Sequence, residues 1–203
     1  MSNDLLTALL NKASTNWGMD ELNIQDAMAR IAFHESKYGT PNYAPVQISD
    51  KSSTGFGPGR GKYQYEIGDE QGAHSAINRL ISFNKASGGK YDISFLDNLI
   101  NNKTYDFSKL TPEEQDILFL ADKLGDETAN MGTYDFNNDG ILSNEELSGF
   151  HADEHWAGYG GVGDVVVNLT GGIGPTKPPN LLDMMERNAF MDKASQDYQF
   201  YKP

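Results

Sequence analysis

The chain has 203 residues, enough for one substantial hydrophobic core, so we expect a single domain over residues 1–203. Its 29 acidic and 16 basic residues give a net charge of −13. This argues against nucleic acid as a partner, because a phosphate backbone is bound by clustered Lys and Arg. Cysteine is absent, which excludes disulfides and thiolate chemistry.

Hydrophobic periodicity predicts a mainly α chain, of the α+β class, with a small β element. We expect helices over residues 4–13, 21–38 and 72–85, after Thr111, and over 180–195. Alternating stretches at 46–48 and 62–67 predict two strands that pair in a small sheet. Thr111, Pro112 and Glu114 have the spacing of a capping box with proline in the first turn. Residues 158–179, with seven Gly and three Pro, predict a long loop.

The sequence shows no membrane-targeting pattern. No apolar run approaches the ~18 residues of a membrane span, so we expect no spanning segment. The first ten residues lack the basic region and cleavage site of a secretory signal peptide. Any action outside the cytoplasm then requires another exit route.

The segment from Asp135 to Glu146 matches the EF-hand calcium-binding pattern at every diagnostic position. The expected oxygen ligands are Asp135, Asn137, Asp139, the backbone carbonyl of Ile141, Ser143 and Glu146. Gly140 permits the sharp turn, and Leu142 is the expected apolar anchor. Three carboxylates among the ligands favour Ca²⁺ over Mg²⁺, although a solvated Asx-rich turn is the alternative.

The residues before this loop, 126–134, contain Gly132 and predict a poor entering helix. We therefore expect a single, unpaired hand. Such a hand suits a structural ion better than a calcium sensor, because a sensor needs two well-formed helices that reorient.

Glu35 shares one face of the second predicted helix with Ile24, Met28 and Ile31. Eleven residues make almost three turns, so Glu35 lies nearly in line with Ile24 along the helix axis. A carboxyl at the end of an apolar stripe is partly desolvated, which favours its protonated form. A general acid in glycoside cleavage needs that form. The alternative is a Glu35 that reaches solvent or pairs with Lys37.

Glu35-Ser36 is followed by a Gly-rich stretch and then by Gly55-Phe-Gly-Pro-Gly-Arg-Gly-Lys-Tyr-Gln-Tyr-Glu66. Over residues 21–160, this pattern resembles the lysozyme-like superfamily of peptidoglycan-cleaving enzymes, especially lytic transglycosylases and phage muralytic proteins. The segments 114–122 and 155–158 are similar to phage versions. The resemblance implies a lysozyme-like domain with an inserted calcium loop that cleaves the β-1,4 glycan strand of peptidoglycan. It also implies a place in the phage virion, with other virion proteins as partners, or in the host cytoplasm before release to the wall.

By this resemblance, Glu35 is the general acid. The implied substrate-binding residues are Ser36, Tyr63, Gln64, Tyr65, His155 and Trp156. Lys62 departs from the pattern, which usually has an apolar residue there. The pattern assigns no second carboxylate, and Glu66 is the candidate. Without a base, the substrate's N-acetyl group captures the oxocarbenium centre and gives an anhydro product. With a carboxylate base, water attacks and hydrolysis follows.

Two alternatives belong to other classes of protein. His151-Ala-Asp-Glu154-His155 spells an inverted zinc-protease motif, which predicts a zinc peptidase. The second alternative is a non-catalytic, calcium-stabilised module that binds glycan or builds the virion. For the aromatic rings of Tyr63, Tyr65, Trp156 and Tyr159, packing in the core is the alternative to sugar contact, and it is the commoner fate of such rings.

Overall fold

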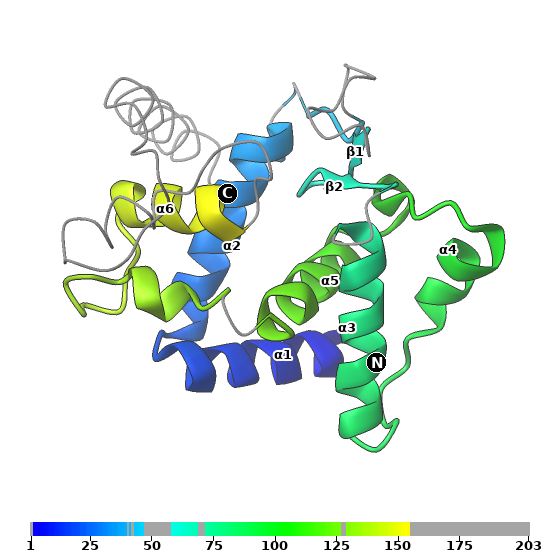
Figure 1. Cartoon of the computed structure of the whole chain (residues 1–203), viewed down its shortest axis with the longest axis horizontal. Coiled ribbons are helices and arrows are strands. Elements are labelled where there is room, and N and C mark those ends of the chain that lie inside the picture. Colours follow the sequence, from blue (N-terminus) through cyan, green and yellow to red (C-terminus); the bar gives the residue numbers. More distant parts are fainter. Residues whose placement is uncertain are drawn as a thin grey trace, which may run out of the picture.

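The computed structural model describes residues 2–39, 41, 43–46, 58–68, 72–126 and 129–154 (Figure 1). This part of the chain is mainly helical, as predicted. Its α-helices are α1 (Ser2–Trp17), α2 (Glu21–Ser36), α3 (Ala73–Ala86), α4 (Asp97–Asn102), α5 (Pro112–Leu124) and α6 (Asn144–Glu154). Its 3₁₀ helices are η1 (Ser94–Leu96), η2 (Phe107–Lys109) and η3 (Met131–Tyr134). Within the described ranges, no helix has the length and apolar character needed to cross a membrane.

The four helices predicted before residue 130 are all present, with shifted ends. α1 continues to Trp17, and α2 stops at Ser36 because Lys37 adopts a left-handed conformation (φ 59°) and donates its backbone N–H to Phe33 O. The predicted capping box starts α5: Thr111 Oγ1 accepts the Glu114 N–H, and Glu114 Oε2 accepts the Thr111 N–H. The short helix α4 was not predicted. The long loop at 158–179 and the helix at 180–195 lie outside the described residues.

The core forms around α5, against which both α1 and α3 pack (Figure 1). Four successive residues of α5, 117–120, are fully buried, and Ile24 and Ile31 of α2 are buried with them in one cluster. The apolar stripe that the sequence placed on α2 therefore faces the core. This packing sets the rotation of α2 about its own axis.

The β element is smaller than predicted. β1 (Gly59–Arg60) pairs antiparallel with β2 (Tyr65–Glu66), and Val46 adds a single bridge to Arg60. Residues 62–64, predicted to begin the second strand, belong instead to the turn at 61–64 between the two strands. Gly61 explains the turn: its φ is +81°, and a Cβ there would lie 2.4 Å from Gln115 Oε1. Only glycine suits both the backbone conformation and this close contact.

Candidate functional site

Glu35 is the penultimate residue of α2, at the point where this helix meets the β hairpin. The Ser36 hydroxyl donates to Lys62 O at 2.9 Å, and the Ala44 N–H donates to Ser36 O at 2.8 Å. These bonds tie the end of α2 to the hairpin. The Glu35 side chain is only 12% exposed, so its carboxyl is largely removed from water.

His151 of α6 contacts this carboxyl. Its Nε2 lies 2.5 Å from Glu35 Oε1, and the His151 side chain is 3% exposed. Two bare acceptor atoms repel each other at such a distance, so a proton must lie between them, carried by one or the other. The sequence placed His151 on an exposed zinc motif, whereas the structure turns it inward against α2.

His34 completes the group. Its Nδ1 lies 3.7 Å from Glu35 Oε1, and its ring meets the His151 ring edge-on, with centroids 4.6 Å apart. Burial lowers the pKa of the His34 imidazole below its ordinary 6.5, against the raising effect of the neighbouring Glu35 carboxyl. The imidazole is therefore neutral near pH 7. Sequence reasoning missed His34, and its position beside the candidate acid was the available signal.

The loop before α6 is closed by its own side chains. Asp135 accepts the N–H groups of Asp139 and Gly140, at 3.1 and 2.8 Å. Asn137 Oδ1 also accepts the Asp139 N–H, and Asp139 Oδ1 accepts the Ile141 N–H. Gly140 has φ +78°, as the predicted sharp turn requires. The three side chains are thereby held toward the interior of the loop.

Glu146, in the first turn of α6, joins the two ends of this loop. Its Oε1 accepts the Phe136 N–H and its Oε2 accepts the Ser143 N–H, both at 2.8 Å. Leu142 is buried, as expected of the apolar anchor. The loop is entered by the 3₁₀ turn η3 instead of an α-helix, in agreement with the poor entering helix predicted. Gly132 in η3 packs against Trp17 O, where a Cβ would lie 1.9 Å away.

The loop is also fastened to α2. Asn23 donates to Gly140 O at 2.7 Å, and Arg30 donates to Leu142 O at 2.7 Å and to Asn144 Oδ1 at 3.1 Å. Arg30 is 7% exposed. Because α6 follows directly from the loop, these bonds set the position of α6 beside α2. They thereby help to place His151 at Glu35.

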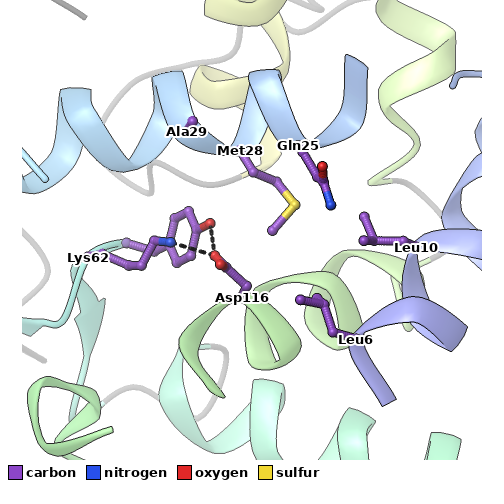
Figure 2. Close-up of a pocket in the computed structure, with 8 residues that line it drawn as sticks. Leu6, Leu10, Gln25, Met28, Ala29, Lys62 and Asp116 are labelled. Atoms are coloured by element: carbon purple, nitrogen blue, oxygen red, sulfur yellow. Dashed lines mark hydrogen bonds and ion pairs between the residues drawn. The ribbon is translucent and has the colours of Figure 1, made fainter. Parts of the chain in front are cut away.

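A pocket of about 200 Å³ lies between α1, α2, α5 and the turn at 61–64 (Figure 2). Lys62 Nζ and the Tyr63 hydroxyl both donate to Asp116 Oδ1 there, at 2.7 and 2.5 Å. Lys62 also lies 4.5 Å above the centre of the Tyr38 ring. These partners explain how a lysine occupies a position expected to be apolar. Glu35 is not among the residues that line this pocket.

The remaining predicted substrate residues lie in varied places. Tyr63 and Tyr65 are 2% and 5% exposed, and their rings pack on Phe119 and Phe107. This burial leaves neither ring with a face that a sugar could contact. Both tyrosines are core residues that anchor the hairpin to the helices.

Gln64 is partly exposed in the turn, with φ 51°, and donates to Ala44 O and Gly61 O. Glu66 lies on β2 and is half-buried. His155 and Trp156, and the side chain of Glu154, lie outside the described residues. The structure therefore brings Glu35 and Ser36 to the hairpin that carries Gln64 and Glu66.

Comparison of the chain with protein-family models, with curated proteins and with solved structures gives no match in any of the three. The functional argument therefore rests on the chemistry of the site. Two features carry that chemistry: the nearly buried Glu35 with its two imidazoles, and the closed loop at 135–146.

Proposed function

We propose that this chain cleaves the β-1,4 glycan strand of peptidoglycan, as a lytic transglycosylase or muramidase, with Glu35 as the general acid. The supporting observation is the Glu35 carboxyl, nearly buried where a core helix meets the β hairpin and linked by a proton to His151. Loss of water favours a protonated carboxyl. Glycosidic bonds break when such a carboxyl protonates the leaving oxygen.

The step is a proton transfer coupled to bond cleavage. As the bond between the anomeric carbon and the glycosidic oxygen breaks, the proton moves from Glu35 to that oxygen, and positive charge develops on the sugar. The resulting carboxylate lies within hydrogen-bonding distance of His151 Nε2. The Nε2–H of His151 can then donate a hydrogen bond to the new carboxylate and relay a replacement proton from water to Glu35.

The product depends on whether a second carboxylate activates water. Glu66 is the candidate, because it lies on the hairpin that is tied to the end of α2. If Glu66 is no base, Glu66→Gln keeps substantial activity and the wild-type enzyme releases anhydro-muropeptides. Reducing-end products that disappear in Glu66→Gln indicate hydrolysis instead. Mass spectrometry of digested cell walls distinguishes the two.

We also propose that the loop at 135–146 holds one Ca²⁺ as a structural ion. The residues fit the ion, because the side-chain oxygens of Asp135, Asn137 and Asp139 are aligned on the inside of the loop by its own N–H groups. Glu146 spans both ends of the loop. The ligands would be these four, the Ile141 carbonyl and Ser143. A bound ion then stabilises the loop from which α6 carries His151.

The general acid is tested by Glu35→Gln. This change keeps the shape of the side chain and removes the transferable proton, so folding survives and turnover falls by about 10²–10⁴-fold. Glu21→Gln, the same substitution at the other end of α2, is the matched control and keeps wild-type activity. Turbidity clearing of purified cell walls measures turnover, and circular dichroism checks that the folds match.

Wild-type clearing by a folded Glu35→Gln protein contradicts the mechanism. If neither Glu35→Gln nor the wild-type protein clears any wall, the proposed activity fails. The non-catalytic module that binds glycan or builds the virion is then the better assignment.

A further inference from the structure

We propose that His34, Glu35 and His151 form a binding site for one zinc ion, and that zinc bound there switches off Glu35 as a general acid. This site differs from the calcium loop in position and in ligand chemistry. The loop offers oxygen atoms, which suit a hard cation, whereas this group offers two imidazole nitrogens and one carboxylate.

Geometry is the first support for the site. The candidate ligand atoms of the three side chains all lie within 4.8 Å of one another. Zinc holds nitrogen and oxygen ligands at ~2.0–2.2 Å in tetrahedral sites, which puts neighbouring ligand atoms about 3.4 Å apart. The observed spacing of 3.7 Å between His34 Nδ1 and Glu35 Oε1 is already close to that value. The 2.5 Å spacing between His151 Nε2 and Glu35 Oε1 must open by about 1 Å to reach that value, once the proton between them has left.

The state of the ligands is the second support. Zinc binds neutral imidazole and ionised carboxylate, so binding must release any proton that the ligands hold. His34 Nδ1 is a buried ring nitrogen that lies 3.7 Å from Glu35 Oε1, so it is placed to serve as one of these ligand atoms. The proton between His151 and Glu35 is the one that zinc displaces.

The zinc motif on α6 is the competing assignment for His151. That motif pairs His151 with His155, which lies outside the described residues. Within the described residues, His151 points at α2, where His34 and Glu35 meet it. The two arrangements differ in one partner of His151, so substitutions at His34 and His155 separate them.

The inhibitory effect rests on the proposed function, whereas the binding site does not. A carboxylate bound to zinc has no proton to give, and zinc at Glu35 also blocks the approach of the glycosidic oxygen. Zinc at one equivalent should therefore abolish wall clearing, and a chelator should restore it. Calcium in excess should not reverse the inhibition, because a hard cation prefers an all-oxygen site.

Titration of the full chain with Co²⁺ tests the site, with millimolar Ca²⁺ present to saturate the loop. Cobalt reports its coordination through visible absorption, and a four-coordinate ion absorbs much more strongly than the hydrated one. We expect one equivalent to bind and zinc to displace it. His34→Gln and His151→Gln should each weaken binding by more than the roughly 10–100-fold typical of residues behind a metal ligand.

His74→Gln is the matched control, since His74 stacks on Tyr105 away from this group, and it should bind cobalt like the wild type. His155→Gln should also do so. Absence of bound cobalt in the wild type, or unchanged affinity in a folded His34→Gln, overturns the site. Loss of binding in His155→Gln with retention in His34→Gln assigns the metal to the α6 motif and overturns it as well.

Wall clearing separates the two proposals. Clearing by the metal-free protein that persists with one equivalent of zinc bound overturns the inhibitory role. A metal-free wild-type protein that clears no wall contradicts the proposed function, and the cobalt titration then decides the site by itself.

Discussion

Glu35 and His151 lie 116 residues apart in the chain and 2.5 Å apart in the fold. At this distance a hydrogen atom lies between the two side chains, so His151 holds the Glu35 carboxyl in place. If Glu35 is the general acid, His151 is its positioning residue and its source of a replacement proton. A substitution at His151 should then affect the pH dependence of turnover as well as its rate.

His151→Gln keeps the size of the side chain and removes the titrating group. We expect wall clearing to fall by less than the ~10²–10⁴-fold expected for loss of the acid itself, because Glu35 keeps its own proton. The pH dependence of clearing should also change, because an ionisable side chain in contact with the acid has been removed. Glu21→Gln serves again as the control. An unchanged profile would show that His151 has only a packing role.

Tyr63 provides a pH test of stability. Burial first, and then the neighbouring Asp116, raise the pKa of its hydroxyl well above the ordinary 10.0. Above pH 10 the unfolded chain loses this proton while the folded chain keeps it, so stability is present below pH 10 and falls as the pH rises further.

Tyr63→Phe should reduce this alkaline loss of stability. At pH 8 the substitution should cost about 1.5–3 kcal/mol, the usual worth of a hydrogen bond to a charged group. Urea denaturation at pH 8 and at pH 11 measures both effects. The prediction fails if the variant and the wild type lose equal stability between the two pH values.

At the scale of elements, Arg30 is the main connection between α2 and the loop that leads to α6. Its guanidinium contacts Asp26, Leu142 O and Asn144, and the side chain is buried. Arg30→Met keeps most of the apolar stem and leaves these acceptors without that donor. Because Asp26 is about one-third exposed, water replaces part of the loss.

We expect Arg30→Met to destabilise the fold by about 1–3 kcal/mol, the cost of leaving buried polar groups unsatisfied. Amide exchange should rise in the loop at 135–146 and in α6 more than in α3 or α5. Lys12→Met, at an exposed position of α1, is the control and should change stability by less than ~0.5 kcal/mol. Uniform exchange across all helices would contradict a local connection.

At the scale of the whole molecule, calcium should stabilise the fold by mass action. An ion that binds only the folded chain at 100 times its Kd adds about 2.7 kcal/mol. For a chain of this length, each kcal/mol raises Tm by about 2–4 °C, so a rise of roughly 5–10 °C is expected. Calorimetry in chelator and in millimolar calcium measures it.

Asp135→Ala combined with Glu146→Ala should remove this response, because two of the three carboxylate ligands are lost. Magnesium at the same concentration should give a smaller rise, since it prefers a tighter octahedral shell. Identical melting curves with and without calcium would exclude the calcium site.

The features that the sequence determined by itself are local ones. The stripe on α2, the capping box of α5 and the pattern from Asp135 to Glu146 each involve residues within a few turns or one loop of each other. Their physics is short-ranged, since it depends on helical periodicity, on nearby N–H donors and on the positive φ of one glycine. Those features could therefore be predicted without knowledge of the fold.

The long-range contacts near the candidate site were decided only by the tertiary structure. Lys62 meets Asp116 across 54 residues, Arg30 reaches Leu142 across 112, and His151 reaches Glu35 across 116. No periodicity or spacing links such residues, because their proximity results from the packing of the hairpin turn against α5 and of α2 against the loop and α6. The tertiary packing also buries the Tyr63 side chain in the core. It surrounds the Glu35 carboxyl with two imidazoles in place of water.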